Sequence, residues 1–209
     1  MIVVQKFQKV LNEVFSIKKE VKLVVVCKNQ TLSSIFPIIK TGHIHFGENR
    51  VQEAKIKWLN IEKDRNIKLH LIGKLQSNKS KEAVEIFDFI HSLDNLKLAK
   101  SLSDHQKLKG KSLKYFIQVN ISGEVQKSGI SPDNLTEFVN TCRSNLDLDI
   151  IGLMCIPPIN EDPTNNFKIL ADLAKKNNLQ ELSMGMSNDY LKALSCGATY
   201  IRLGSAVFN

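Results

Sequence analysis

The stretch "KLVVVCK" (residues 22–28) holds four apolar residues and a cysteine between two lysines. A continuous apolar run rich in valine is typical of a strand that is covered on both faces, as the strands of parallel sheets are. The sequence turns polar immediately after Lys28. We therefore predict a buried first strand whose C-terminal end presents a lysine, a position that more often belongs to a surface residue than to a reactive amine.

Seven further β-rich runs follow, and amphipathic helical patterns fill most of the gaps between them. The predicted strands are 22–28, 43–48, 68–73, 89–93, 114–120, 150–156, 181–185 and 199–204. The predicted helices are 32–40, 50–62, 78–86, 96–108, 132–144, 163–177 and 188–196, preceded by an N-terminal helical pattern. This α/β alternation predicts a (β/α)8 TIM barrel that forms a single domain over residues 1–209, with an extra N-terminal helix.

A doubly wound open sheet is the structural alternative. The sequence contains neither GxGxxG after the first strand nor GxxxxGK[ST] anywhere, so no glycine-rich fingerprint supports it. Gly197 after the helical pattern 188–196 is expected to cap that helix, and Ser131 before Pro132 is expected to begin the helix at 132.

Composition narrows the class of protein. The chain is 43% hydrophobic and 24% charged, which is ordinary for a globular domain. Its net charge of +8 comes from lysines scattered among acidic residues, so we expect no nucleic-acid partner. No apolar run reaches the length of a membrane span, and four widely separated cysteines favour a reducing, cytoplasmic location.

In such a barrel, the polar residues at the C-terminal ends of the strands share one mouth, where active sites are built. The residues expected there are Lys28, Glu48, Asn49, His70, Gly73, Asn120, Met154, 183–187, Arg202, Gly204 and Ser205. His43 and His45, two positions apart, could bind a metal, but with no third ligand in view packing or exposure is the better interpretation, so no metal site is predicted.

Two segments at this mouth are suited to phosphate. In "GMSNDY" (185–190), Ser187 is expected to be the N-cap of a helix with Asp189 in its first turn, and in "RLGSA" (202–206) Gly204 and Ser205 offer close approach and a donor. Either segment alone would be an ordinary helix cap, but barrels often bind phosphate after strands seven and eight. A partly buried lysine beside a cation can carry a neutral amine and form a Schiff base. Lys28 with such a site suggests either pyridoxal 5′-phosphate (PLP) or the phosphosugar of a class I aldolase.

Seven ordered blocks then identify a family. They are "VVVCK" (24–28), "FGENRVQEA" (46–54), "LHLIGKLQSNK" (69–79), "QVNISGEVQKSGI" (118–130), "IGLMCIP" (151–157), "LSMGMSND" (182–189) and "IRLGSAVF" (201–208). Along nearly its full length the chain resembles the YggS/PROSC family of PLP homeostasis proteins. The resemblance implies a fold type III barrel like the N-terminal domain of alanine racemase.

The resemblance also implies site residues. Lys28 would hold PLP as an internal aldimine, Arg202 would face the pyridine nitrogen, and Ser187, Gly204 and Ser205 would bind the phosphate. Asn49 and Met154 would line the cofactor. A permanent cation beside the pyridine nitrogen disfavours its protonation, which weakens PLP as an electron sink. No catalytic residue is therefore expected.

Two positions depart from the family pattern. Cys27 stands where Ser is usual and could form a reversible thiohemiacetal with an aldehyde, and Lys74 stands where Pro is common. Neutral drift at both positions is the simpler interpretation.

The resemblance favours a monomeric, non-catalytic protein that buffers, delivers or regulates PLP, with apo PLP-dependent enzymes as its recipients. An amino-acid racemase is the main alternative. Racemases of this fold type use a second base, a tyrosine, supplied with a partner subunit and an additional C-terminal β-domain. Tyr115, Tyr190 and Tyr200 fall instead within predicted elements of the barrel. A class I aldolase would need acid–base carboxylates near the lysine, of which only Glu48 is evident.

Overall fold

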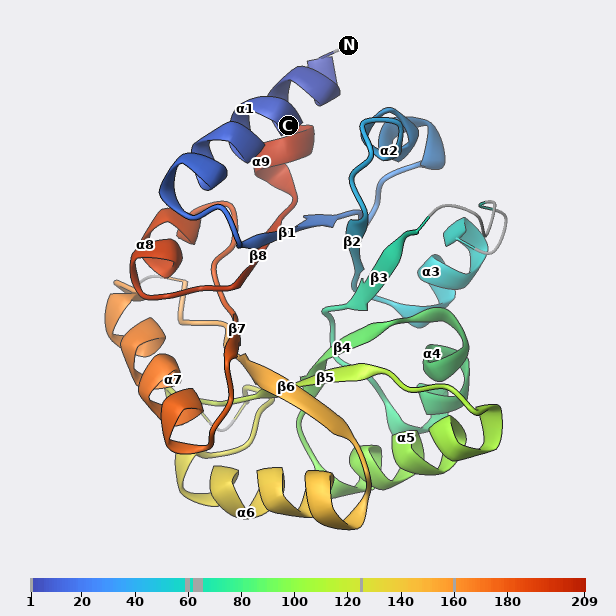
Figure 1. Cartoon of the computed structure of the whole chain (residues 1–209), viewed down its shortest axis with the longest axis vertical. Helices are drawn as coiled ribbons and strands as arrows, with labels where there is room; N and C mark the ends of the chain where they lie inside the picture. The colour runs from blue at the N-terminus through green and yellow to red at the C-terminus, as the bar shows by residue number, and fades with distance from the viewer. Residues whose placement is uncertain (1, 59–60, 62–65, 125, 160) are drawn as a thin grey trace.

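Eight parallel strands close into a barrel, in a computed structural model that describes residues 2–58, 61, 66–124, 126–159 and 161–209 (Figure 1). The strands are β1 (Lys22–Val26), β2 (His45–Glu48), β3 (Lys68–Leu71), β4 (Phe89–Leu93), β5 (Lys114–Gln118), β6 (Asp149–Met154), β7 (Glu181–Ser183) and β8 (Tyr200–Leu203). All eight predicted strands are confirmed. The pairing of β8 with β1, in which Val24 lies opposite Arg202, closes the barrel and rules out the open sheet.

Helices surround the barrel on its outer side (Figure 1). They are α1 (Ile2–Ile17), α2 (Leu32–Ile39), α3 (Val51–Trp58), η1 (Ser77–Lys79), α4 (Ser80–Ile86), α5 (Leu96–Lys109), η2 (Pro132–Asn134), α6 (Leu135–Asn140), η3 (Thr141–Asn145), α7 (Thr164–Lys176), α8 (Tyr190–Ser195) and α9 (Ser205–Phe208). The predicted N-terminal helix is confirmed as α1, which packs against α2 and against α9, a short helix that was not predicted.

The predicted helix ends agree in part with the structure. Gly197 follows α8 with a φ of 97°, a left-handed conformation that suits a glycine after a helix. Ser131 precedes η2 as predicted, although its side chain makes no capping hydrogen bond. The predicted helix 50–62 is described only as far as Trp58, and most of its predicted C-terminal part lies outside the described residues.

The core has two layers, which explains the apolar run of the first strand. Val24 points into the barrel and packs with Phe89, Phe116, Met154 and Tyr200. Leu23 and Val25 point outward into the larger core between the strands and the helices. Alternate residues of a strand face opposite sides, so a strand covered on both sides must be apolar at every position.

Within the described part of the chain, no helix combines the length and the apolar composition needed to cross a membrane. The same residues contain no group of three or more histidine, cysteine or carboxylate side chains placed to hold a metal ion. His43 and His45 instead pack with aromatic rings, among them Phe7, Phe46 and Tyr200.

Candidate functional site

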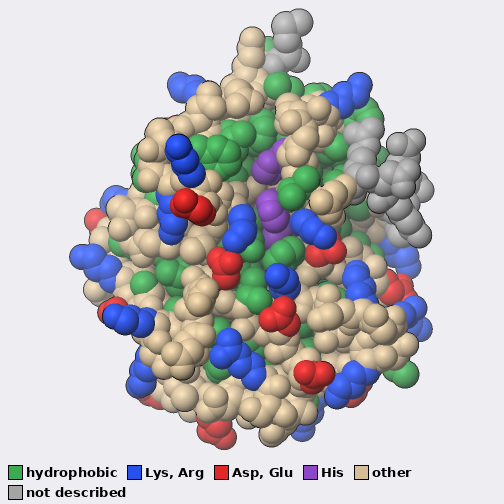
Figure 2. Space-filling view, viewed as in Figure 1, with side chains coloured by type: hydrophobic (Ala, Val, Ile, Leu, Met, Phe, Trp, Pro, Cys, Tyr) green, Lys and Arg blue, Asp and Glu red, His purple; other side chains and the backbone are tan. Residues whose placement is uncertain are grey.

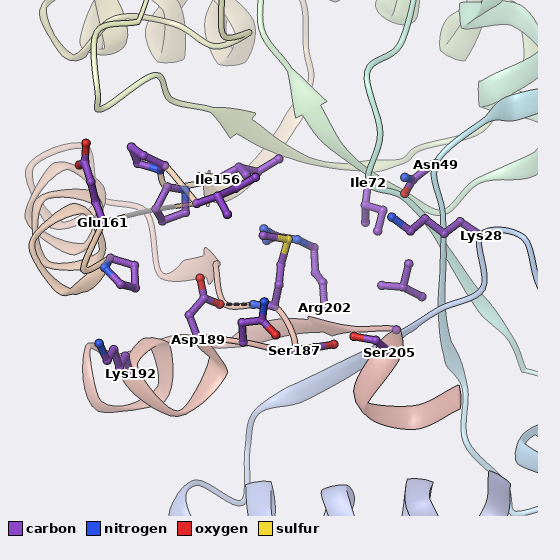
Figure 3. A pocket seen from close by; sticks show the side chains of 18 residues that line it. Lys28, Asn49, Ile72, Ile156, Glu161, Ser187, Asp189, Lys192, Arg202 and Ser205 are labelled. Carbon is purple, nitrogen blue, oxygen red and sulfur yellow. Dashed lines mark hydrogen bonds between the residues drawn. The ribbon is translucent and has the colours of Figure 1, made fainter. Parts of the chain in front are cut away.

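A cavity of about 540 Å³ opens at the C-terminal mouth of the barrel (Figure 3). It brings together six of the seven residues predicted to form the site, which are Lys28, Asn49, Ser187, Arg202, Gly204 and Ser205. In Figure 3, Lys28 and Asn49 lie on one side, Ser187 and Ser205 lie along one edge, and Arg202 lies between them. The remaining wall includes apolar side chains, among them Ile72 and Ile156, and two carboxylates, Glu161 and Asp189.

Lys28 lies two residues after Val26, the last residue of β1, and reaches the cavity from the C-terminal end of that strand. Its side chain is exposed, as a lysine at the end of a strand more often is, rather than partly buried. It has no ion pair or hydrogen bond within the described residues, so the ammonium group is accessible to a ligand.

The backbone just before Lys28 is held from two sides. The Cys27 N–H donates to the carbonyl of Gly47 on β2, at 2.8 Å. The Cys27 carbonyl accepts a hydrogen bond from Lys57 Nζ on α3, at 2.6 Å. These bonds fix the point at which the chain leaves the barrel, and therefore the origin of the Lys28 side chain.

Lys57 is itself held by a buried carboxylate. Glu48 Oε1 accepts hydrogen bonds from Lys57 Nζ and from the indole N–H of Trp58, each at 2.8 Å. Glu48 is fully buried and points toward α3, so the prediction that it lies at the mouth is wrong. Sequence reasoning missed Lys57 and Trp58 because no local spacing links a strand end to a side chain nine or ten positions later.

Lys57→Met is expected to lower the free energy of unfolding by about 3 kcal/mol, because a buried carboxylate loses its cation. Urea unfolding at neutral pH measures this loss. Glu48→Gln combined with Lys57→Met should be less destabilised than Lys57→Met alone, since the charge is gone while the new amide oxygen can still accept from Trp58. An equal loss in both variants would contradict this account.

Arg202 lies on β8 and is 4% exposed. Nη1 donates to Ser183 Oγ at 2.7 Å, and Nη2 donates to the Cys155 carbonyl at 3.1 Å. Burial lowers the pKa of Arg202, and nearby Cys155 and Asp189 oppose that shift. A guanidinium keeps its proton in proteins even when it is buried, so the cavity has a fixed positive charge at its floor.

The loops after β7 and β8 are joined to each other. Ser187 Oγ accepts a hydrogen bond from the Ala206 N–H at 3.2 Å. The prediction that Ser187 is an N-cap is wrong, because the N-cap of α8 is Asp189, whose carboxylate accepts from the Met186 N–H at 2.6 Å. The two serines at the cavity, Ser187 and Ser205, are therefore held by one connected pair of loops.

Gly185 begins the first of these loops with a φ of 91°. A Cβ there would lie 2.6 Å from the Ala193 Cβ and 3.0 Å from the Tyr190 Cα. Gly185→Ala is therefore expected to cost about 2 kcal/mol or more of stability and to displace Ser187 from the cavity. Thermal unfolding and PLP titration measure the two effects. Gly42→Ala is the control, since a Cβ at that left-handed glycine meets nothing within 4 Å. An equal loss of ligand affinity in both variants would contradict the steric argument.

Besides Glu48, two other predicted mouth residues lie elsewhere. Met154 is fully buried and packs inside the barrel, and the structure does not support its prediction as a site residue. His70 is also fully buried, stacked on Phe89, and does not reach the rim. Successive residues of a strand face opposite sides, and both of these residues occupy positions that face the barrel interior.

Cys27 is buried in the outer core, and its Sγ donates to the Val25 carbonyl at 3.3 Å. Burial, and then the negative charge of Glu48, raise the pKa of the thiol well above its ordinary value. The thiolate, not the thiol, is the nucleophile, so Cys27 is not placed to react with an aldehyde at the mouth.

The chain matches known proteins along nearly its whole length. Residues 6–209 match the family model described as the N-terminal domain of alanine racemase. The pyridoxal phosphate homeostasis protein of Vibrio alginolyticus is 36% identical over 201 residues, covering 91% of this chain and 86% of the relative. The protein of that name from Escherichia coli K12 is 34% identical over 200 residues, covering 91% of this chain and 86% of the relative.

Solved structures of similar proteins have the same fold. PipY from Synechococcus elongatus, 34% identical, matches without PLP at a TM-score of 0.91, covering 100% of both chains. PipY with PLP bound matches at 0.89, covering 99% of this chain and 100% of PipY. An alanine racemase from Clostridium difficile matches at 0.78 over 97% of this chain and 56% of its own, but at 13% identity it shows the fold alone.

The fold and the matched family model place the chain among the barrels of the alanine racemase N-terminal domain class. More narrowly, the chain belongs to the family of pyridoxal phosphate homeostasis proteins.

Proposed function

We propose that this protein binds PLP at the C-terminal mouth of its barrel and acts in PLP homeostasis without catalytic turnover. The observation that carries the proposal is the meeting of the accessible Lys28 amine, two serines and the buried Arg202 cation in one cavity. When bound, PLP supplies an aldehyde that condenses with a primary amine to form a Schiff base.

The donors in the cavity fit PLP group by group. Lys28 is a primary amine in the cavity wall, and the hydroxyls of Ser187 and Ser205 offer donors to a phosphate group. Gly204 lines the same cavity with backbone alone. Arg202 can only donate hydrogen bonds, so beside a pyridine nitrogen it favours the unprotonated form of that nitrogen. Asn49, next to Lys28 in Figure 3, adds an amide to the same wall.

The position of the tyrosines favours a carrier over a racemase. Tyr115 is buried and donates to Gln106, and Tyr190 donates to Glu13 on α1. Tyr200 lies in the barrel interior with its ring below the Lys22 ammonium. Within the described residues, therefore, no tyrosine lines the cavity to act as the second base that racemisation needs.

A class I aldolase is less well supported. Glu48, the carboxylate that could have served next to the lysine, is buried against α3. The carboxylates that do line the cavity, Glu161 and Asp189, lie on the side away from Lys28 in Figure 3.

Relatives named pyridoxal phosphate homeostasis proteins support a role in holding and passing on the cofactor. An aldehyde held on Lys28 would be open to exchange with another primary amine, which would free the Lys28 amine, so delivery to apo-enzymes would need little beyond Lys28 and the phosphate donors. We propose apo PLP-dependent enzymes as recipients, a monomeric state and a cytoplasmic location.

Two assays test this function. The protein loaded with PLP is incubated with a panel of L-amino acids, and chiral analysis detects any D-isomer; sustained turnover would overturn the non-catalytic proposal. In parallel, loaded protein is mixed with an apo PLP-dependent enzyme. Recovery of that enzyme's activity faster than with an equal concentration of free PLP would support delivery.

A further inference from the structure

The opposite, N-terminal end of the barrel carries a second cavity, also of about 540 Å³. Its wall contains four cationic side chains and one carboxylate, which are Lys22, Lys68, Lys114, Arg143 and Glu181, together with His45 and Tyr200. Figure 2 shows histidine side chains near the middle of the face that looks down the barrel, surrounded by lysine, arginine and acidic side chains. The charge in this wall is strongly positive, and it comes from side chains far apart in the sequence.

Two of these four cationic side chains have no acidic or hydrogen-bonding partner within the described residues. Lys22 pairs with Glu181 at 2.9 Å, and Arg143 donates to the Ile150 carbonyl at 2.8 Å. Lys68 and Lys114 make neither an ion pair nor a side-chain hydrogen bond within the described part of the chain. The carboxylates of Asp88 and Asp149, at neighbouring strand starts, do not line the cavity. Like charges held around one cavity repel, and a bound anion would relieve that repulsion.

A chain of hydrogen bonds runs from this cavity through the barrel to Arg202. His45 Nδ1 lies 2.9 Å from His70 Nε2, and His70 Nδ1 lies 2.9 Å from His91 Nε2. His91 Nδ1 lies 2.7 Å from Ser183 Oγ, which accepts from Arg202 Nη1. His70, His91 and Ser183 are fully buried, so the chain is isolated from water between its ends.

Arg202 sets the direction of these bonds. Because the guanidinium only donates, Ser183 Oγ accepts from it, and the acceptor for the serine proton within the described residues is His91 Nδ1. A buried hydroxyl without an acceptor costs about 1–3 kcal/mol, which disfavours the reverse direction. A neutral imidazole has one N–H, so His91 and His70 each donate from Nε2. His45 therefore has its N–H on Nε2, which makes no hydrogen bond within the described residues.

We propose that the N-terminal cavity binds a small multivalent oxyanion, with the Lys68 and Lys114 ammonium groups and the His45 Nε2–H as donors. Charge and donor count fit this chemical class, because phosphate and citrate carry several acceptor oxygens and more than one negative charge. An anion at His45 also polarises each successive hydrogen bond, so the electrostatic effect of the anion reaches Arg202 at the other end of the barrel. This site does not depend on whether PLP binds at Lys28.

The test titrates the full chain, uniformly 15N-labelled, with inorganic phosphate at constant ionic strength and pH 7.5, with sodium chloride making up the difference. The side-chain nitrogens of His45, His70 and His91 are followed by NMR. A saturable shift at His45, with smaller shifts at His70, is the expected result, at a dissociation constant below about 1 mM. A second titration with citrate distinguishes a phosphate group from a polycarboxylate as the preferred ligand.

Matched charge variants make the test specific. Lys68→Met with Lys114→Met should weaken binding about tenfold or more. Lys9→Met with Lys100→Met removes the same charge from exposed positions on α1 and α5 that line neither cavity, and should leave binding unchanged. A response that does not saturate with either anion, or equal weakening in both double variants, would overturn the proposal. Borohydride labelling of Lys28 in the same samples shows separately whether the PLP site is intact.

Discussion

Lys28→Ala is expected to abolish the covalent attachment of PLP. The wild-type protein incubated with PLP and reduced with borohydride should carry a pyridoxyl label on Lys28, because this amine is accessible and lines the same cavity as Ser187, Ser205 and Arg202. Alanine removes the lysine Nζ, the only atom at that position that can form a bond to the aldehyde. Peptide mapping by mass spectrometry locates the label, and the yellow colour of the loaded protein should be lost with it.

Lys192→Ala is the matched control, since Lys192 lines the same cavity from α8 and pairs with Asp162 at 3.1 Å. It should keep the label on Lys28. The Lys28→Ala protein should still bind PLP reversibly through its phosphate donors, which equilibrium dialysis detects. Label found on another lysine of the wild type, or full labelling of Lys28→Ala, would refute the assignment of Lys28.

The architecture was predictable because it depends on local pattern. Each β-rich run is short, and each gap has helical spacing. A strand that is apolar on both faces, such as 22–28, is compatible with few folds. In a parallel barrel all strand ends of one kind meet, so the grouping of Lys28, Arg202 and Ser205 followed from topology. The strand limits themselves were predicted one or two residues too long at several ends, where apolar residues continue into loops.

The direction of individual side chains was less predictable. Glu48 and Met154 are the last residues of β2 and β6, yet one points outward to Lys57 and the other inward to Phe116. Whether the last residue of a strand faces the barrel, the helices or the mouth depends on register and on where the strand stops. A register shift of one residue moves a side chain to the opposite face of the sheet. The sequence pattern locates strand ends only to within one or two residues, so it cannot decide the direction.

The histidines show the same limit. His45, His70 and His91 lie on three successive strands, and nothing in their spacing indicates that their rings are within hydrogen-bonding distance. The pairing of β2 with β3 and of β3 with β4 brings these inward-facing rings together. The interior is consequently polar along one path, from His45 to Arg202, and apolar around Val24 and Phe116.

That polar path makes the fold sensitive to acid. Burial lowers the pKa of His43 and of His45 to about 4, and burial lowers the pKa of His70 and of His91 well below the ordinary value. Neighbouring cations, such as Arg202 beside His91, act in the same direction. In the unfolded chain these rings titrate near 6.5. Below that pH the unfolded state binds protons that the folded state does not, so stability falls as the pH falls.

The free energy of unfolding should therefore decrease between pH 6.5 and pH 5, by about 3 kcal/mol from the two fully buried histidines alone, since each contributes a slope that rises from about 0.7 kcal/mol per pH unit at pH 6.5 toward about 1.4 at lower pH. Urea unfolding at pH 7.5, 6.5 and 5 measures this slope. His91→Gln keeps a donor and an acceptor at the position but cannot take up a proton, so the unfolded chain gains one proton fewer and the slope should be smaller.

His105→Gln on α5 is the control for this slope, because His105 is half-buried and lies outside the hydrogen-bonded chain. Loss of carboxylate ion pairs also destabilises proteins in acid, but it affects both variants equally. A smaller slope in His91→Gln than in His105→Gln therefore isolates the barrel interior as the source. Identical slopes in the two variants would mean that the interior histidines take up protons without unfolding, and that a charged ring is stabilised inside the barrel despite Arg202.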